Sequence, residues 1–232
     1  MTIQPDDVRS PGSSAFFRIG VALLVPLVLV LTNVRLMLTP GLVSAEYATP
    51  GFPPDSYGFT PGERVDWAKR SLEYLLNDSG PDFLEGFHLA DGTPLYNERE
   101  LQHMVDVKGL VQKALALWLA SVAMMAVFLA GAWRTGGWPQ AREGLRLGAR
   151  ITLIVMAILI ALVLLAFPLL FEFGFHRVFF DSGTYLFSYS DSLIRLFPLR
   201  FWRDAFGLLL LLTLGEAGGL VFLTRERRPS SL

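Results

Sequence analysis

The chain has 232 residues with a formal net charge of −1; 52% of them are hydrophobic, and the mean hydropathy is +0.44. Soluble domains of this length carry fewer apolar residues, so the composition favours a membrane protein. The charge gives no reason to expect a nucleic-acid partner, and the absence of cysteine excludes disulfides, thiol nucleophiles and cysteine metal ligands.

Four apolar stretches approach the roughly 20 residues that a helix needs to cross a bilayer. They predict an all-α integral membrane protein, organised as a single membrane domain over residues 1–232. We expect its four transmembrane helices at about 16–38, 110–133, 151–171 and 205–223. The third of these stretches contains no charged residue at all.

The first span has an alternative interpretation as a secretion signal. Arg9 and Arg18 precede a short apolar core, and the segment VSA at 43–45 resembles a signal-peptidase site. That segment lies far beyond the apolar core and past Pro40. We therefore expect the span to be retained as a membrane anchor, with cleavage as the alternative.

Arginine is concentrated in two short segments beside the predicted spans. Between the second and third spans four arginines oppose a single acidic residue, Glu143, and the C-terminal tail carries three more arginines. Because cytoplasmic loops are enriched in positive residues, both segments and both termini are predicted to be cytoplasmic. An extracytoplasmic cap of about 39–107 then joins the first two spans, and an outer loop, 172–204, joins the last two.

The cap contains two patterns that are typical of helix starts. The segment TPGE at 60–63 has the form of a capping box with proline at the first helical position, and it predicts a helix from Pro61 to about Asn77. The apolar face of this helix is predicted to consist of Val65, Ala68, Leu72, Leu75 and Leu76. The segment NERE at 97–100 has the same form, so the helix of the second span is predicted to begin near Glu98.

Two histidines are predicted to lie at one depth in the membrane. The helix expected over 98–133 would be about 54 Å long, whereas the hydrocarbon layer takes only about 30 Å. His103 and Asp106 are therefore expected at headgroup depth, where lipid esters lie. His176 follows the third span and is expected at the same depth, with Glu172 four residues before it on one helical face. We predict that His103 and His176 lie within about 10 Å of each other.

Asp106 lies one helical turn after His103. A carboxylate in this position can orient an imidazole and raise its basicity, as in a catalytic dyad. It can equally pair with Lys108, Arg99 or Arg177, and each histidine can simply be an interfacial residue. No H-E-x-x-H motif occurs, and three histidines would have to converge in space to bind a metal, so we expect no metal and no cofactor. No G-x-S-x-G motif indicates a serine nucleophile.

Two charged residues belong to the other spans. Arg35 ends the first span near the outer surface, where it can hold a lipid phosphate or extend toward water. Glu216 lies inside the fourth span, where a carboxylate is a candidate functional residue. Because Gly215, Gly218 and Gly219 predict close helix packing there, we interpret Glu216 as a protonated or hydrogen-bonded packing residue, with a proton relay as the alternative.

Two stretches of the sequence resemble a known family. They are HMVDVK at 103–108, and FHRVFF at 175–180 followed by SDSLIRLFPLRFWRD at 190–204. Together with the four-span layout, they resemble the bacterial four-span membrane proteins that include the lipoprotein intramolecular transacylase. The resemblance covers roughly Tyr96 to Asp204.

The resemblance implies an acyltransferase of the bacterial cell membrane, with its active site on the extracytoplasmic face. Its partners would be membrane lipids and a lipoprotein whose N-terminal cysteine carries a thioether-linked diacylglyceryl group. The sn-2 acyl chain would move to the cysteine α-amine and give a lyso-form lipoprotein. The motif histidines correspond to His103 and His176, and the spacing in HMVDVK includes Asp106. To substrate or lipid binding we assign Arg177, Lys108, Glu172 and Arg35; no oligomeric state is implied.

Transfer from an ester to an amine needs an acceptor for the ammonium proton and a donor for the glycerol alkoxide. One histidine can take the first proton and either can return the second. Because amine and ester belong to one substrate, no covalent acyl-enzyme is required. Two other functions remain open: a non-enzymatic membrane protein whose outer cap binds lipid or a partner, and a phospholipid-directed hydrolase or acyltransferase.

Overall fold

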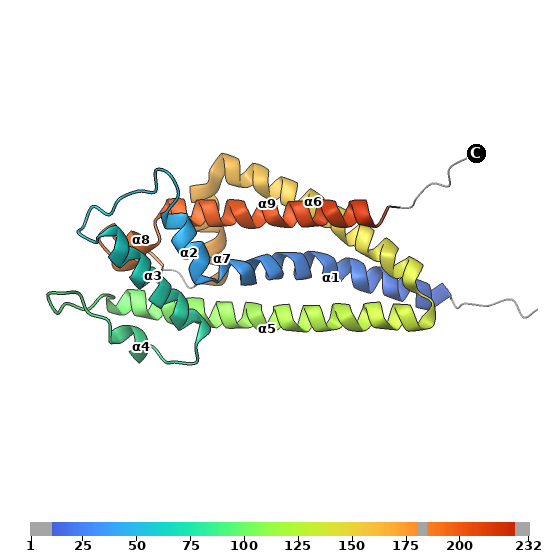
Figure 1. The fold of residues 1–232 in the computed structure, drawn as a ribbon, viewed down its shortest axis with the longest axis horizontal. Helices are drawn as coiled ribbons and strands as arrows, with labels where there is room; N and C mark the ends of the chain where they lie inside the picture. The colour runs from blue at the N-terminus through green and yellow to red at the C-terminus, as the bar shows by residue number, and fades with distance from the viewer. Residues whose placement is uncertain (1–10, 181–184, 226–232) are drawn as a thin grey trace, which may run out of the picture. The chain divides into compact units, whose positions relative to one another are not determined.

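A computed structural model describes the backbone of residues 11–180 and 185–225, and the side chains of 15–171, 174–180 and 185–225. Over these residues the chain is all-α, as predicted, with one isolated bridge between His88 and Pro94 (Figure 1). Within them, the helices that are long and apolar enough to cross a membrane are α1 (Pro11–Met37), α5 (Glu98–Thr135), α6 (Trp138–Leu169) and α9 (Leu199–Leu223).

Shorter elements connect these helices, and the chain forms two compact units. The short elements are α2 (Pro40–Tyr47), α3 (Pro61–Leu76), α4 (Asp82–Glu85), the π-helix η1 (Leu170–Phe175), α7 (His176–Phe179) and α8 (Ser192–Leu196). The first unit takes its described residues from 1–32, 117–157 and 211–232. The second unit consists of 33–116 and 158–210, and it contains all of the short elements.

In the first unit, α1 and α6 approach each other closely at two glycines of α6. A Cβ atom added at Gly144 would lie 3.1 Å from the Cα atom of Arg18, and one added at Gly148 would lie 3.1 Å from the Cα atom of Ala22. The backbone carbonyl oxygens of Arg18 and Ala22 would be closer still. Small residues at this spacing let membrane helices pack through their backbones, which matters because lipid provides no hydrophobic drive for helix association.

The glycines that were predicted to mediate packing in the fourth span do not do so. A Cβ atom added at Gly215, Gly218 or Gly219 would meet no atom of the described residues within 4 Å, so that prediction is wrong. Glu216 is exposed on α9, whereas Ala217 beside it is buried. A cluster of glycines only permits close approach, and the facing helix decides whether it occurs.

Both predicted helix starts are confirmed. At α3, the Thr60 hydroxyl accepts from the Glu63 N–H at 3.2 Å, and the Glu63 carboxylate accepts from the Thr60 N–H at 2.8 Å. At α5, the side-chain Oδ1 of Asn97 accepts from the Glu100 N–H at 3.1 Å, and the Glu100 carboxylate accepts from the Asn97 N–H at 2.8 Å. Each box satisfies backbone donors that a first turn leaves without helical partners, so α5 begins at Glu98 and continues into the span.

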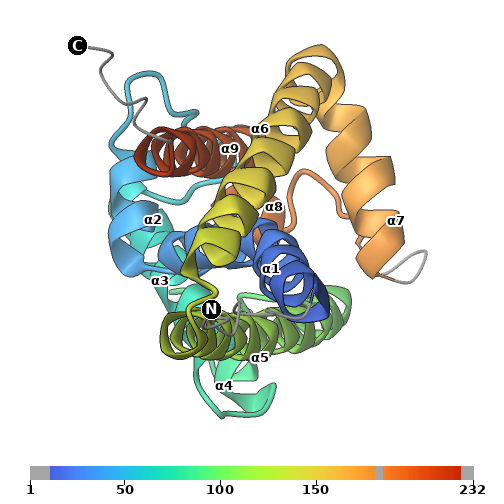
Figure 2. The ribbon, with the colours of Figure 1, turned by 90° about the vertical axis from the view of Figure 1, so that its right-hand side faces the viewer.

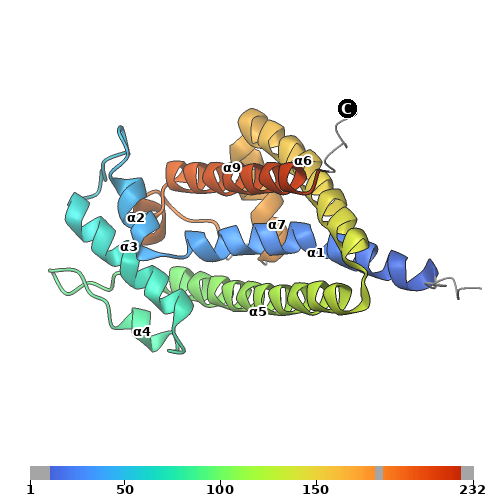
Figure 3. The ribbon, with the colours of Figure 1, turned by 45° about the vertical axis from the view of Figure 1, so that its right-hand side comes forward.

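The buried face of α3 includes Ala68 and Leu72, as predicted, but it also contains polar residues and leaves out Leu76. In Figures 1 and 3, α3 passes between α2 and the first turns of α5, and it also contacts α8. Its neighbours cover Arg64, Ser71 and Tyr74, whereas Leu76 is 39% exposed. The buried polar groups are hydrogen-bonded, since Arg64 donates to two backbone carbonyls and the Ser71 hydroxyl lies 2.6 Å from that of Tyr96.

The end of α6 is bent, and this bend sets the direction of the segment that carries His176. Ala166 has non-helical backbone angles (φ −150°, ψ 35°), and Pro168 follows two residues later. Proline has no N–H to donate, and its ring displaces the carbonyl four residues earlier, so the helix cannot continue straight. Figure 2 shows the chain turning here, with η1 and α7 leading away from α6. The α-helical alignment expected for Glu172 and His176 is replaced by π-helix.

Candidate active site

The two histidines lie side by side in the second unit. His103 projects from α5 and is 8% exposed, while His176 is the first residue of α7. Their ring centroids are 6.0 Å apart and the ring planes differ by 23°. The prediction that they lie within about 10 Å is therefore confirmed, although the two residues are far apart in the sequence.

Aromatic rings surround this pair. The ring of Phe180 lies 4.9 Å from that of His103, and the ring of Phe187 lies 5.2 Å from it. Phe171 and Tyr185 contact His176, with centroid distances of 4.5 and 5.1 Å. The imidazoles are thus enclosed mainly by apolar surface, in which proton transfer and hydrogen bonds are less exposed to water.

The π-helix places one carbonyl oxygen under His176. In η1 the Phe171 oxygen accepts the backbone N–H of His176, five residues later. The same oxygen lies 2.6 Å from Nδ1 of the His176 ring. Because a carbonyl can only accept, Nδ1 carries the proton, and Nε2 is the basic nitrogen of the neutral ring.

The expected dyad between His103 and Asp106 is not formed. Nδ1 of His103 is buried and has no hydrogen-bond partner among the described residues. The Asp106 carboxylate instead accepts a 3.1 Å hydrogen bond from Gln102, four residues earlier on the same helix. His103 turns into the aromatic cluster, while Asp106 stays on the partly exposed face of α5.

Lys108 has a structural position rather than the expected lipid contact. Its ammonium group donates to the Asn77 side chain at 3.1 Å and to the Ser79 carbonyl at 2.6 Å, and it lies 4.1 Å from the centre of the Tyr74 ring. The residue is 8% exposed. Lys108 therefore ties the C-terminal end of α3 to α5, as a buried cation with satisfied donors does.

The other predicted binding residues are not brought to the imidazoles. Arg177 is exposed on α7, and Arg35 is half-buried near the end of α1. Among the described residues, no contact joins either guanidinium to His103 or His176. Glu172 belongs to η1, but its side chain lies outside the described residues.

Glu100 fastens the outer loop to α5, a role that the sequence analysis missed. Beyond its capping bond, its second oxygen accepts the backbone N–H of Leu193 at 2.7 Å, and the residue is 1% exposed. Asn97 and Arg99 also contact Asp191, just before α8. The capping pattern located Glu100, but only the folded loop shows what its free oxygen binds.

A buried ion pair holds α8 against the cap. Arg195 donates two hydrogen bonds to Asp55, at 3.1 and 3.0 Å, and their side chains are 10% and 2% exposed. Burial acts to raise the pKa of Asp55, but hydrogen bonds from Arg195 and from the backbone N–H of Phe59 outweigh it and lower the pKa below its usual 3.8. The Arg195 guanidinium also lies 3.6 Å from the centre of the Phe59 ring.

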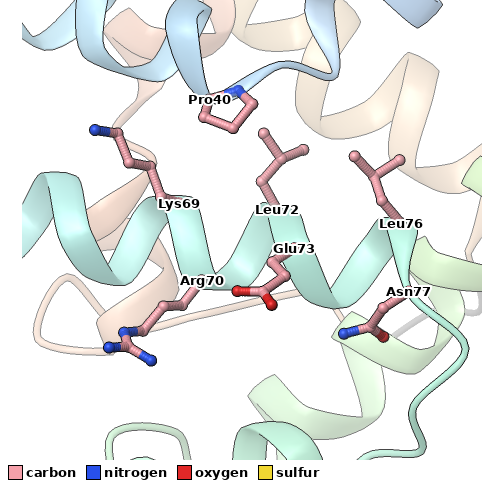
Figure 4. A pocket seen from close by; sticks show the side chains of 7 residues that line it. All are labelled: Pro40, Lys69, Arg70, Leu72, Glu73, Leu76 and Asn77. Atoms are coloured by element: carbon pink, nitrogen blue, oxygen red, sulfur yellow. The ribbon is translucent and has the colours of Figure 1, made fainter.

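A hollow of about 460 Å³ lies elsewhere, between Pro40 and α3. Figure 4 shows Leu72 and Leu76 pointing toward Pro40, with Arg70 on the opposite side of α3. No histidine lines this hollow. Lys69 and Glu73 line the hollow, but neither His103 nor His176 does, so it is distinct from the pair of imidazoles.

A family model described as lipoprotein intramolecular transacylase Lit matches residues 19–202 of the chain. The chain belongs to this family. The match spans α5, η1, α7 and α8 and therefore includes both histidines. Its four spans and its family make it a multi-pass integral membrane protein.

Relatives of this Lit-family chain include an uncharacterized protein of Aquifex aeolicus, which is 28% identical over 192 residues, 78% of this chain and 85% of the relative. Among solved structures, the membrane-integral lipoprotein intramolecular transacylase Lit of Bacillus cereus superposes with a TM-score of 0.64 at 16% identity, covering 91% of this chain and 94% of that one. A variant of the same protein with one histidine replaced by arginine gives a TM-score of 0.58 at 16% identity, covering 92% and 91%. At these identities the likeness shows that the fold is shared.

Proposed function

We propose that this Lit-family protein transfers an acyl chain within a lipoprotein. The substrate is a lipoprotein with a free N-terminal cysteine whose sulfur carries a diacylglyceryl group, and the sn-2 chain moves to the α-amine. The observation that carries the proposal is the pair of imidazoles 6.0 Å apart, one of which has its tautomer set by a backbone carbonyl.

The reaction needs two proton movements and no covalent enzyme intermediate. The free amine attacks the sn-2 ester carbonyl and forms a tetrahedral intermediate with a protonated nitrogen and an oxyanion. The nitrogen then loses one proton, the bond to the glycerol oxygen breaks, and that oxygen gains one proton. An ester and an amine become an amide and an alcohol, and the intramolecular geometry replaces a second binding event.

His176 is suited to move this proton. Its Nε2 takes the proton that the nitrogen releases and delivers it to the departing glycerol oxygen. While the ring is protonated, the Nδ1–H bond to the Phe171 oxygen stabilises the imidazolium and keeps the ring in place. We assign the general base to His176 and not to His103, because no described carboxylate orients His103.

His103 is suited to hold the amine. A buried nitrogen without a hydrogen-bond partner costs free energy, roughly 1–3 kcal/mol, which a bound N–H group would recover. The attacking nitrogen has two hydrogens after it has formed its bond to carbon. One of them can bond to His103 and the other to His176, so that two stacked imidazoles orient a single nitrogen. Two neighbouring rings in an apolar cluster also disfavour double protonation, which keeps His103 able to accept.

Tyr185 is the candidate for stabilising the oxyanion. Among the described residues it is the hydroxyl-bearing ring that contacts an imidazole, at 5.1 Å from His176. A hydroxyl that donates to the developing negative charge lowers the barrier most when it is already in position. One observation supports an extracytoplasmic site, namely that the arginine-rich segments lie at the opposite ends of the predicted spans from the two histidines.

The test uses purified protein with a synthetic diacylglyceryl lipopeptide in detergent. Intramolecular transfer leaves the mass of the peptide unchanged, so the product is recognised by tandem mass spectrometry from fragments that carry an N-acyl group. We expect these fragments with the wild-type protein and with His88→Ala, whose imidazole lies in an exposed loop of the cap. Loss of one acyl chain from the peptide would indicate a hydrolase, and an unchanged peptide would support the non-enzymatic alternative.

A further inference from the structure

A second cavity lies between the bent end of α6 and the start of α9. It has a volume of about 280 Å³. Its apolar wall consists of five residues of α6 between 163 and 168, and its other wall is the start of α9 with Leu199, Arg200 and Arg203. Neither histidine lines it, so this cavity is separate from the candidate active site.

The apolar wall belongs to the surface that faces lipid chains. Leu164 and Leu165 are 80% and 83% exposed, and they lie near the end of a helix long and apolar enough to span a membrane. In a bilayer such side chains are covered by acyl chains. A ligand that enters the cavity from this side therefore comes from the membrane and has apolar chains.

The polar wall has an excess of positive charge. Arg200 and Arg203 both bond to the Asp204 carboxylate, at 3.1 and 3.0 Å, so two guanidiniums share one anion. Glu46 approaches this group, and burial, followed by the proximity of Asp204, raises the pKa of Glu46 above its usual 4.5. The N-terminal end of α9 adds the positive end of its helix dipole at the same place.

The two arginines differ in their freedom to bind a ligand. Arg200 also donates to Gly51, Pro50 and Thr49, so its guanidinium is held by the segment after α2. Arg203 is 57% exposed and uses Nε on Asp204, and its terminal nitrogens bond to no described residue. The two terminal nitrogens of Arg203, which lines the cavity, can thus donate to a ligand there, in the fork geometry that suits a phosphate.

We propose that this cavity binds the phosphate group of an anionic membrane phospholipid, whose acyl chains lie along Leu164 and Leu165. The cavity holds a phosphate with part of its glycerol but not a whole lipid, which fits a ligand that remains in the bilayer. The lipid of the proposed lipoprotein substrate has no phosphate. The site therefore selects a bulk phospholipid and does not depend on the proposed transfer reaction.

Native mass spectrometry of the full chain in detergent tests this proposal. The protein is titrated with phosphatidylglycerol and, separately, with diacylglycerol that has the same acyl chains. We expect phosphatidylglycerol to bind and diacylglycerol to bind at least about tenfold more weakly, since it lacks the charged acceptor. Equal binding of the two lipids would overturn the proposal.

Two variants locate the site. Arg203→Gln should weaken phosphatidylglycerol binding about tenfold, because it removes one charged donor group. Val163→Trp keeps every charge but fills the cavity, and it should weaken binding to a similar extent. Arg134→Gln, which removes an exposed arginine at the far end of α5, is the matched control and should bind as the wild type does. Unchanged binding in both cavity variants would overturn the assignment.

Discussion

Each of the two units is stabilised internally by a different kind of interaction. In the first unit, α1 and α6 meet through Gly144 and Gly148, and the buried residues around them are small and apolar. In the second unit, buried polar groups join segments far apart in the chain, as Arg195 joins Asp55 and Glu100 joins Leu193. Helices in lipid gain little from burying apolar surface and rely on close backbone contact. A polar group buried away from water costs free energy unless it is paired, and the buried polar groups that join the segments of the second unit are paired.

This difference explains where the candidate site lies. The stacked imidazoles need fixed positions from α5, η1 and the outer loop, and polar links such as the Glu100–Leu193 bond provide them. Contacts at glycines set the short distance between two helices, but they do not orient an imidazole ring. Substitutions in the second unit should therefore affect the chemistry, whereas those in the first unit should affect only stability.

The largest effect is expected for the two histidines. His103→Ala and His176→Ala should each lower acyl transfer by about 10²–10⁴-fold, the usual scale for loss of an acid–base group. Rates are measured with the lipopeptide assay per molecule of folded protein, with His88→Ala as the matched histidine control. Near-wild-type turnover by His176→Ala would remove the proposed proton carrier.

Breaking the buried ion pair should have the next largest effect, on stability. Arg195→Ala leaves the Asp55 carboxylate buried without its partner, which should lower the free energy of unfolding by about 3–5 kcal/mol. Arg18→Ala in the first unit breaks a 3.4 Å pair whose side chains are 44% and 58% exposed, and it should cost about 0–1 kcal/mol. Thermal unfolding in detergent compares the two variants. Equal losses would contradict the contrast between the units.

The effect of a glycine substitution on the stability of the first unit should depend on the position of the glycine. Gly148→Ala places a Cβ atom against the backbone of Ala22, so the helices must separate, at a cost of about 1–3 kcal/mol. Gly218→Ala adds the same atom in open space and should be neutral or slightly stabilising, because alanine favours helix. Unfolding temperatures decide the outcome, and transfer per folded molecule should stay unchanged in both variants.

Acid should weaken the second unit through Asp55. Because its pKa is lowered in the folded protein, the stability it contributes is fully present above its unfolded value near 3.8. That contribution is lost as the pH falls through the lower folded pKa. The difference in unfolding temperature between the wild type and Asp55→Asn should therefore narrow below about pH 3.8. A difference that stays constant from pH 6 to pH 3 would show that the carboxylate's charge contributes nothing.

The smallest effect is expected for Asp106. Its carboxylate bonds to Gln102 and not to His103, so Asp106→Asn should change the transfer rate by no more than about twofold. The pH profile of transfer, measured beside the rate, should also stay in place. A loss of a hundredfold or more would show that the dyad forms when substrate binds.

Several features followed from the sequence because they depend on local interactions. The capping boxes at 60–63 and 97–100 involve residues three apart, and the four spans follow from runs of apolar residues. The expectation that His103 and His176 share one depth came from the lengths of the predicted spans, and it was enough to predict the short distance between their rings. These features need no knowledge of which segments meet.

Only the tertiary structure decided the remaining features, because each depends on a partner that is distant in the chain. A pattern of glycines does not reveal which helix will pack against it. The sequence therefore could not show that Gly144 and Gly148 contact α1, whereas Gly218 contacts no described residue. Asp106 was a plausible partner of His103 by spacing alone, but the aromatic cluster turned the imidazole away from it. The π-helix, which directs the Phe171 carbonyl to His176, arises after a bend whose outcome depends on how the neighbouring segments pack.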